Sequence, residues 1–155
     1  MATDHWLRNH QGTLQKMKSK MYKPYMEAAR AFAVLSYAER KKVGAVAITP
    51  QDVMLYSWNG RVAGGDNVCE IDGQNVTRPD VLHAEANIVS KAAREGISLK
   101  GSTIVVTLSP CLPCAMQMFQ AGVSRVIYDE EYRITDGIDF LHEQGVQIDK
   151  YEDIE

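Results

Sequence analysis

Two cysteines three positions apart are the residues of this chain best suited to chemistry. Cys111 and Cys114 stand in the stretch TLSPCLPCAMQMF, residues 107–119, in which an apolar run is followed by the start of a predicted helix. Backbone amides at a helix start favour anionic sulfur, and side chains at i and i+3 share one helical face. The pair is therefore predicted to hold one metal ion, with a redox pair and a structural zinc site as the alternatives.

Candidate partners for the two thiols are few. The chain has four histidines, of which His5 and His10 lie in a polar N-terminal arm, His142 in the last predicted helix and His83 in VLHAEAN. His83 is expected to begin a helix, and Glu85 can point into the same cavity without binding the metal. Two thiolates and one imidazole leave a fourth position of Zn²⁺ for water, which is the ligand count of a catalytic site. A nearby carboxylate can then move protons.

Each part of this site also has a simpler interpretation. A redox pair would leave His83 and Glu85 unexplained, and the thiols lack the aromatic-Cys-Gly-Pro-Cys context of thioredoxin-like proteins. A closed structural zinc site would need a fourth ligand, for which Cys69 is the candidate. Glu85 alone could be an acid that interacts with a helix N-terminus. The combination of His-x-Glu with a later Pro-Cys-x-x-Cys favours catalysis over these alternatives.

The predicted elements place both motifs at helix starts. Strands are predicted over residues 43–49, 53–58, 103–108, 125–128 and 146–148. Helices are predicted from Pro24 to about Arg40, from an Asp80 N-cap to Gly96, from about Cys111 to Ala121 and over about 137–144. A long loop runs from Asn59 to about Pro79. This order predicts an α/β fold of three layers (α/β/α), in which a five-stranded mixed sheet carries helices on both faces.

Size, charge and cysteine content narrow the class of protein. The 155 residues suit a single domain over 1–155, in which residues 1–20 form a polar arm. The apolar runs are too short to span a membrane and the N-terminus lacks a signal-peptide pattern, so a cytoplasmic location is expected. In a reducing compartment three cysteines favour metal binding or catalysis over disulfides. A net charge of −3 argues against nucleic acid as a partner of the whole surface.

The pairing of His83-x-Glu85 with Pro110-Cys111-x-x-Cys114 resembles the signature of zinc-dependent nucleobase deaminases. Beyond this site the chain resembles the deoxycytidylate (dCMP) deaminase family, and particularly its phage and bacterial members. The matching segments, which cover most of residues 24–149, are LSYAERKKVGAV (35–46), SWNGRVAGGDNVCE (57–70), HAEANIV (83–89), GSTIVVTLSPCLPCAMQMFQAGVSRVIY (101–128) and EEYRITDGIDFLHEQGVQI (130–148). The resemblance implies a cytidine deaminase-like fold and hydrolysis of dCMP to dUMP and ammonia, which supplies dUMP for thymidylate synthesis.

The resemblance also implies roles for individual residues. His83, Cys111 and Cys114 would bind Zn²⁺, which lowers the pKa of a water ligand from about 15.7 toward about 7, and Glu85 would relay protons. No organic cofactor is implied. Substrate contacts are expected from seven residues: Asn59 to the sugar, the backbone of Ala84 to the pyrimidine, Arg40, Tyr132 and Arg133 to the phosphate, with Ser109 and Pro110 completing the set. Arginine suits a phosphate because its guanidinium binds in a bidentate manner. Lys41 and Lys42 are expected to be solvated.

Regulation and assembly are expected from the resemblance alone. Many members are activated by dCTP and inhibited by dTTP near a glycine-rich loop, which NGRVAGGDN (59–67) resembles. The candidate residues for such effectors are Gly60, Gly64, Gly65 and Asn67. A homo-oligomer is expected, since members are often hexamers. A second structural zinc, which some phage relatives carry, is doubtful because the loop offers only Cys69; Ala38 also replaces a frequent family cysteine.

Rival functions remain open from the sequence. A tRNA adenosine deaminase or a free-base cytosine deaminase shares the zinc signature, although a tRNA enzyme should show a basic face. A zinc-binding assembly module without activity would keep the thiols and the histidine but would place no demand on Glu85. Loss of deaminase activity in a Glu85→Ala variant that still binds zinc would separate these classes.

Overall fold

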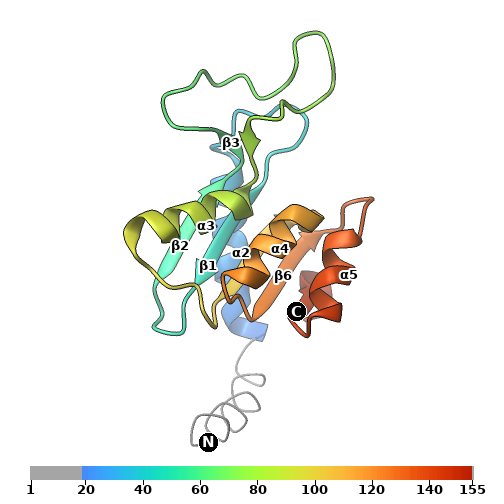
Figure 1. Cartoon of the computed structure of the whole chain (residues 1–155). Helices are drawn as coiled ribbons and strands as arrows, with labels where there is room; N and C mark the ends of the chain where they lie inside the picture. The colour runs from blue at the N-terminus through green and yellow to red at the C-terminus, as the bar shows by residue number, and fades with distance from the viewer. Residues whose placement is uncertain (1–18, 155) are drawn as a thin grey trace, which may run out of the picture.

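A mixed five-stranded sheet forms the centre of the protein, whose computed structural model describes residues 19–154 (Figure 1). The strand order is β2-β1-β5-β6-β7; β1 runs antiparallel to β2 and β5, whereas β5, β6 and β7 are parallel. The strands are β1 (Gly44–Ile48), β2 (Met54–Trp58), β5 (Thr103–Leu108), β6 (Arg125–Glu130) and β7 (Gln147–Lys150). A separate antiparallel pair comprises β3 (Gly60–Arg61) and β4 (Val81–Leu82). The predicted mixed sheet is confirmed.

Helices cover both faces of this sheet. In Figure 1, α2 (Ser19–Ala33) lies behind it, while α3 (Ala84–Glu95), α4 (Leu112–Gln120) and α5 (Asp136–Glu143) lie in front. A short 3₁₀ helix, η1 (Tyr151–Asp153), follows β7. None of the helices within residues 19–154 has both the length and the hydropathy needed to cross a bilayer. The predicted three-layer arrangement is confirmed. Of the predicted arm, residues 1–18 lie outside the described residues, whereas residues 19 and 20 already belong to α2. The prediction that this helix begins at Pro24 was therefore wrong, and Pro24 lies inside the helix.

Alternation along the central strands creates two separate cores. Val46, Val105 and Ile127 are buried beneath α2, where they meet Met26 and Ala29. Successive side chains in a strand point to opposite faces, so the neighbours of these residues lie beneath the other three helices. That second core contains Ala45, Ala47, Ile104, Val106, Val126 and Tyr128. Burial on both faces explains why these strands are almost continuously apolar in the sequence.

The prediction that the first helix extends to about Arg40 was wrong. Helix α2 ends at Ala33, and the backbone N–H groups of Val34, Leu35 and Ser36 bond to carbonyls three residues back, as in a tightening last turn. The side chains of Val34 and Leu35 are exposed, so no buried face continues the helix. The Ser36 hydroxyl instead donates to a backbone carbonyl beyond β2, 2.8 Å away. Contacts distant in sequence therefore stop the helix.

The predicted N-cap at Asp80 was also wrong. Val81 and Leu82 pair with β3, and this pairing delays the start of α3 until Ala84, with His83 as the N-cap. The Asp80 carboxylate accepts instead from the guanidinium groups of Arg61, at 2.6 Å, and Arg78, at 3.1 Å. At the other end Gly96 terminates α3 in the left-handed conformation, as predicted.

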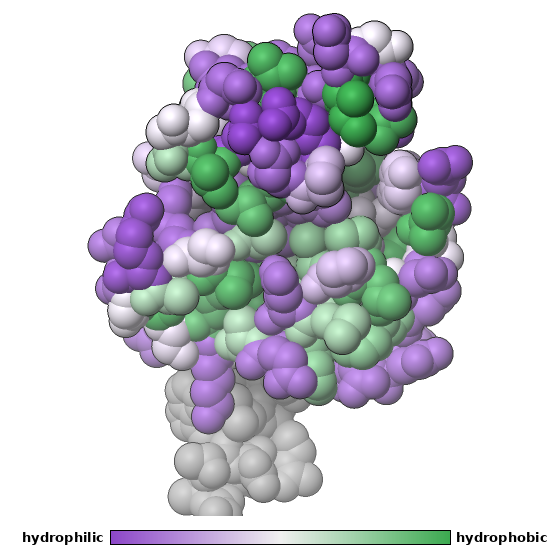
Figure 2. Space-filling view, turned by 45° about the horizontal axis from the view of Figure 1, so that its top comes forward, coloured by the Kyte–Doolittle hydropathy of each residue, from purple (hydrophilic) through white to green (hydrophobic). Residues whose placement is uncertain are grey.

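The long loop between β3 and β4 projects from the top of the molecule in Figure 1. The sequence predicted only a long loop here, but Glu70 and Thr77 form an isolated antiparallel bridge, and the N–H of Ile71 donates to the carbonyl of Val76 at 2.9 Å. Hydrophobic side chains lie among hydrophilic ones over the upper part of the surface (Figure 2). The loop therefore contains a small hairpin over residues 70–77 and has a mixed surface.

Side chains of α3 cover the outer edge of the sheet. The amide of Asn87 donates to the carbonyl of Trp58 at 2.8 Å, and the ammonium of Lys91 donates to the carbonyl of Tyr56. Lys91 also lies 4.1 Å from the centre of the Tyr56 ring. Unpaired edge carbonyls invite pairing with another chain, so these two bonds protect β2 and fix α3 against it.

Candidate metal centre and active site

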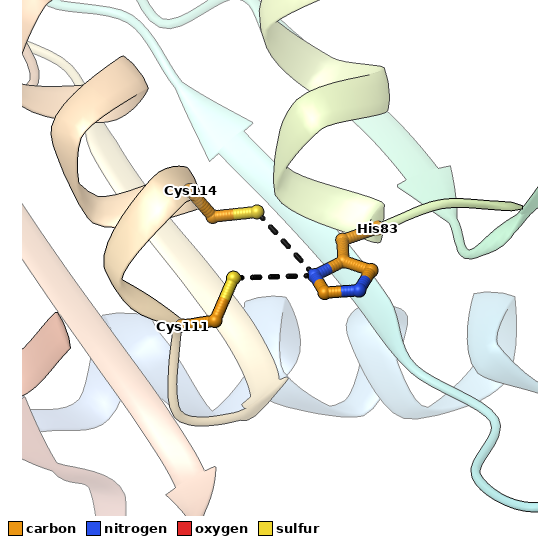
Figure 3. Close-up of side chains that lie close together, drawn as sticks. All are labelled: His83, Cys111 and Cys114. Carbon is orange, nitrogen blue, oxygen red and sulfur yellow. Dashed lines mark hydrogen bonds between the residues drawn. The ribbon is translucent and has the colours of Figure 1, made fainter. Parts of the chain in front are cut away.

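The structure brings together His83, Cys111 and Cys114 (Figure 3). The Nδ1 atom of His83 lies 3.3 Å from the sulfur of Cys111 and 3.5 Å from that of Cys114. The potential ligand atoms all lie within 4.8 Å of one another. Among the described residues, this is the one group of three or more His, Cys, Asp or Glu side chains spaced for a metal.

Two helix starts position these side chains. His83 is the N-cap of α3 and Cys111 the N-cap of α4, and both have extended backbone, with φ of −71° and ψ of 158° and 165°. Their carbonyls accept the first helical bonds, from Asn87 at 3.0 Å and Ala115 at 2.9 Å. Cys114 follows in the first turn of α4. The N-terminal ends of α3 and α4 therefore meet at the cluster, where their dipoles favour thiolate.

The spacing fits a tetrahedral zinc ion. With Zn–S bonds of about 2.3 Å and Zn–N bonds of about 2.0 Å, two ligands of one ion lie about 3.5 Å apart. The two observed nitrogen–sulfur distances are close to this value. Cys69 is not a fourth ligand, because it is buried in a separate cluster with Ala38 and Val81. The cluster thus offers three ligands, which matches a catalytic rather than a closed structural site.

Ionisation of the thiols is shared between them. The neighbouring Cys114 thiol, with help from His83, lowers the pKa of Cys111 to about 4, whereas the pKa of Cys114 is raised because it keeps the shared proton. The hydrogen bond with Cys111 raises the pKa of His83. The Cys111 thiol therefore ionises more readily than an ordinary thiol, and binding of a metal ion would displace the proton that Cys114 keeps.

Glu85 lies in the first turn of α3 and is only 4% exposed. Burial disfavours its charged form and raises its pKa to about 7. A carboxyl group with this pKa can accept and return a proton near neutral pH. An acid that only interacts with the dipole at the start of a helix could stay exposed to solvent. Because Glu85 is instead buried beside His83 and Cys114, the proton-transfer interpretation is favoured over the helix-dipole interpretation.

Two residues that support the site were missed by the sequence analysis. The buried Ser57 hydroxyl donates to the carbonyl of Ala84 at 2.5 Å, which ties the start of α3 to β2. A Cβ atom at Gly137 would lie 2.1 Å from the carbonyl oxygen of Pro110 and 2.8 Å from the carbonyl carbon of Cys111. A serine in a strand and a glycine near a helix start carry no local signal of such contacts.

Asn59, expected to contact the sugar, is buried near the end of β2. Its side-chain oxygen accepts from the N–H of Val43 at 2.9 Å, and its amide nitrogen donates to the carbonyl of Lys41 at 2.9 Å. Asn59 therefore holds the chain segment that enters β1. One amide hydrogen remains for another acceptor, so the contact with the sugar stays a prediction.

The residues expected near the phosphate lie on neighbouring segments. Arg133 lowers the pKa of Tyr132, and the charge of Arg40 adds to this effect, so the three side chains lie within electrostatic range. Arg40 and Arg133 are exposed. The hydroxyl of the buried Ser109 accepts from the N–H of Tyr132 at 2.8 Å and so fixes the chain after β6.

Three other expectations concern residues near these segments. Pro110 is fully buried, and the backbone of Ala84 begins α3 beside the metal ligands. Lys41 and Lys42 are exposed, in keeping with the expectation that they are solvated. Lys41 also forms an exposed ion pair with Glu130, because the segment after α2 returns to the carboxyl end of β6.

The four residues proposed for effectors lie in β3 and the projecting loop. Gly64 has a φ of 87°, which suits glycine, whereas a Cβ atom at Gly60 would meet nothing within 4 Å. Asn67 and Gly65 are exposed, and Asp66 between them pairs with Arg61 at 2.7 Å. The structure accounts for the loop without an effector, so nucleotide binding there stays a prediction.

Comparisons with known proteins bear on this site. Residues 19–130 match the family model described as the cytidine and deoxycytidylate deaminase zinc-binding region. The chain is 30% identical over 133 residues to ComE operon protein 2 of Bacillus subtilis (strain 168). This match covers 83% of this chain and 69% of that protein. It is 34% identical over 120 residues to the deoxycytidylate deaminase of Mycobacterium phage D29. This match covers 69% of this chain and 92% of the phage protein.

A solved structure is similar over nearly its full length. It is the dCMP deaminase from the cyanophage S-TIM5 in complex with dCMP and dUMP, with a TM-score of 0.80 and 41% identity over 84% of this chain and 96% of that one. The expected cytidine deaminase-like fold is confirmed by this similarity. The family match spans α2 to β6 and includes all three clustered residues and Glu85. The chain is therefore a member of the cytidine and deoxycytidylate deaminase zinc-binding family.

Proposed function

We propose that this protein hydrolyses dCMP to dUMP and ammonia at a zinc ion held by His83, Cys111 and Cys114. The observation that carries the proposal is the cluster of one imidazole and two thiols with the buried Glu85 beside it. The similarity to a dCMP deaminase at 41% identity supports the choice of substrate. The supply of dUMP for thymidylate synthesis follows as the proposed role.

The zinc ion would supply Lewis acidity, because it lowers the pKa of a water ligand toward about 7. His83 presents Nδ1 to the metal position, while the two cysteines approach from the first turn of α4. Burial of Cys114 and Glu85 excludes bulk water from one side of the site. The exposed His83 marks the side from which a substrate can enter.

Glu85 moves the protons of the reaction. Its carboxylate accepts a proton from the attacking water as the water oxygen bonds to C4 of the cytosine ring, and passes this proton to the ring nitrogen N3. The resulting tetrahedral adduct carries a hydroxyl group and an amino group on C4. Glu85 then takes the hydroxyl proton and delivers it to the amino group, the C4–N bond breaks, and ammonia leaves. Its pKa near 7 suits both acceptance and return of a proton.

The decisive experiment follows the loss of cytosine absorbance with zinc-loaded protein. Wild type and Glu85→Gln are compared on dCMP, CMP, deoxycytidine and cytosine, with zinc content measured for both. Turnover of dCMP by wild type and its loss by at least about 100-fold in the variant, with zinc retained, is expected. Because Gln is uncharged and close in shape, the variant should be at least as stable as wild type. A folded, zinc-loaded wild type that turns over none of the four would refute the proposal and direct attention to RNA substrates or to a zinc module without activity.

The phosphate of dCMP is proposed to bind Arg40, Tyr132 and Arg133. The electrostatic influence of Arg40 and Arg133 on the same tyrosine supports this grouping. Two guanidinium groups can neutralise a dianionic phosphate and donate several hydrogen bonds to it. Asn59, Ala84, Ser109 and Pro110 are proposed to shape the remainder of the substrate site. An Arg40→Ala variant that loses more activity on dCMP than on deoxycytidine, which has no phosphate, would support the assignment.

Further proposals concern regulation, assembly and location. Activation by dCTP and inhibition by dTTP at residues 59–67 would appear as changed sigmoidicity of dCMP turnover, and unchanged kinetics with both nucleotides would remove the idea. A homo-oligomer, with a hexamer as the expected form, would be measured by light scattering. We also propose one domain over residues 1–155, in keeping with a family match that spans residues 19–130. A cytoplasmic location would keep the paired thiols reduced.

A further inference from the structure

The segment that carries Arg40 belongs to no helix or strand. Residues 39–43 lie between the end of α2 and the start of β1. Without regular backbone pairing, their position depends on side chains from other segments. Asn59 holds the carbonyl of Lys41 and the N–H of Val43, as described above. That leaves the first two residues of the segment, Glu39 and Arg40, to be held by other groups.

Those groups come from the projecting loop. One carboxylate oxygen of Glu70 accepts from the N–H of Glu39 at 2.8 Å and from the N–H of Arg40 at 3.1 Å. The guanidinium of Arg40 donates to the hydroxyl of Thr77 at 3.3 Å. Glu70 and Thr77 are bridged to one another as partners across the loop hairpin. Both the backbone and the side chain of Arg40 are therefore held by the same small hairpin.

The hairpin itself is anchored. Cys69, next to Glu70, is 1% exposed and packs against Ala38, which precedes the segment, and against Val81 of β4. The N–H of Arg78 donates to the carbonyl of Cys69 at 2.8 Å. The apolar contact between Cys69 and Ala38 thus holds the loop against the segment that carries Arg40. The Glu70 carboxylate then fixes the orientation of the backbone at Arg40.

We infer that Glu70 is a positioning residue that sets the preference of the site for a phosphorylated substrate by holding Arg40. The inference rests on the proposed function, in which Arg40 binds the phosphate of dCMP. A carboxylate that accepts two backbone N–H groups makes charge-assisted hydrogen bonds, which are stronger than neutral ones. Without them the segment before Lys41 loses its fixed backbone, and Arg40 must be ordered anew each time a phosphate binds.

The charge of Glu70 acts in the opposite direction to its proposed role. A carboxylate near a dianionic phosphate repels it, so removal of the charge alone would strengthen binding of a nucleotide. Loss of positioning would weaken it. The sign of the change in phosphate preference therefore separates the two effects. Glu70→Gln removes the charge but keeps an oxygen that can accept both N–H groups, whereas Glu70→Ala removes both.

The test uses full-length, zinc-loaded protein and compares binding of dUMP with that of deoxyuridine by calorimetry, together with kcat and KM for dCMP. In Glu70→Ala the preference for dUMP over deoxyuridine should fall roughly tenfold and KM for dCMP should rise, with kcat changed less than about twofold. Glu70→Gln should keep the wild-type preference or exceed it slightly. Asp72→Ala removes a carboxylate from the same exposed loop and should also leave the preference unchanged.

A double-mutant cycle with Arg40→Ala shows whether Glu70 acts through Arg40. In the Arg40→Ala background, Glu70→Ala should cause no further loss of preference. If Glu70→Ala does not fold, Thr77→Val tests the same hairpin with little change in shape and should lower the preference about threefold.

The inference is overturned by an unchanged preference in Glu70→Ala, by an equal weakening of both ligands, or by the same loss in the Arg40→Ala background. A wild type that turns over dCMP and prefers dUMP, combined with any of these outcomes, refutes the role of Glu70 alone. A wild type that does not turn over dCMP refutes the proposed substrate and the inference together. A wild type that turns over dCMP but binds both ligands equally refutes the proposed phosphate contacts and the inference, and leaves the proposed reaction standing.

Discussion

Substitution of Gly137 by alanine should disturb the metal centre from outside it. Gly137 is buried in the first turn of α5 and lies against the backbone of Pro110 and Cys111. Its φ is not in the left-handed region, so alanine can adopt the backbone conformation and should even favour a helix by about 1 kcal/mol. Any loss must therefore come from the contact of the added Cβ atom.

The size of that contact can be worked out from the structure. The Cβ atom would lie 2.1 Å from the carbonyl oxygen of Pro110 and 2.9 Å from that of Cys111. An ordinary contact needs about 3.4 Å, so α5 and this backbone must separate by about 1.3 Å. Helix α5 cannot easily move outward alone, because the rings of Phe119 in α4 and Phe140 in α5 pack edge to face at 5.8 Å. Overpacking costs about 1–3 kcal/mol, and the upper end applies here because the contacts are with backbone atoms, so the net loss after the gain in helix propensity is about 2 kcal/mol.

We expect Gly137→Ala to lower the melting temperature by roughly 5 °C, the metal affinity by about tenfold or more, and kcat by about 100-fold. Calorimetry measures the melting temperature, and dCMP turnover measures kcat. The absorption of the Co²⁺-substituted protein reports the geometry of the thiolates. Gly60→Ala is the matched control for stability, because its Cβ atom would meet nothing within 4 Å. Its melting temperature should stay within about 1 °C of wild type.

An unchanged melting temperature together with an unchanged Co²⁺ spectrum in Gly137→Ala would refute this reasoning. It would mean that α5 shifts without moving the Pro110–Cys111 backbone. A lowered melting temperature with an unchanged spectrum and unchanged kcat would refute only the link from α5 to the metal centre.

Three further predictions concern the metal, the core and the pH dependence of stability. Removal of the metal by a chelator should lower the melting temperature, and added Zn²⁺ should restore it. The loss is equivalent to about 2.7 kcal/mol relative to protein at metal concentrations 100-fold above Kd, and an unchanged melting temperature would contradict a metal that binds only the folded state. Met118→Ala should destabilise the protein by about 2–5 kcal/mol in urea unfolding, because Met118 is fully buried. Met116→Ala, at a side chain that is 48% exposed, should change stability by no more than about 0.5 kcal/mol, and equal losses in the two variants would refute the burial argument. Burial, with a contribution from Glu131, raises the pKa of Tyr128 to about 12, so the folded state keeps a proton that the unfolded state loses above about pH 10. The stability of wild type relative to Tyr128→Phe should therefore fall between about pH 10 and about pH 12, and a constant difference over this range would contradict the shift.

Much of the fold was predictable because its elements have strong local signals. Strands β1 and β5 are buried on both faces and are nearly continuous apolar runs, and Gly96 ends α3 in the conformation that glycine favours. Two of the mispredicted helix limits, the end of α2 and the start of α3, lie where distant segments compete with local propensity. At Ala33 the buried face ends and Ser36 bonds to the chain after β2, and before Ala84 the residues of β4 pair with β3.

The sequence by itself determined the candidate metal ligands and the candidate proton-transfer residue, Glu85. His83 and Cys111 each begin a helix after an extended stretch, and residue type and spacing are local properties that a single motif carries. Tertiary structure alone decided that both helix starts face one another with sulfur and nitrogen at zinc-ligand distances. It also decided the contacts of Glu70 and Gly137, on which their proposed roles rest. Their significance lies in contacts with segments 26 or more positions away, and no local periodicity encodes which distant backbone a side chain will meet.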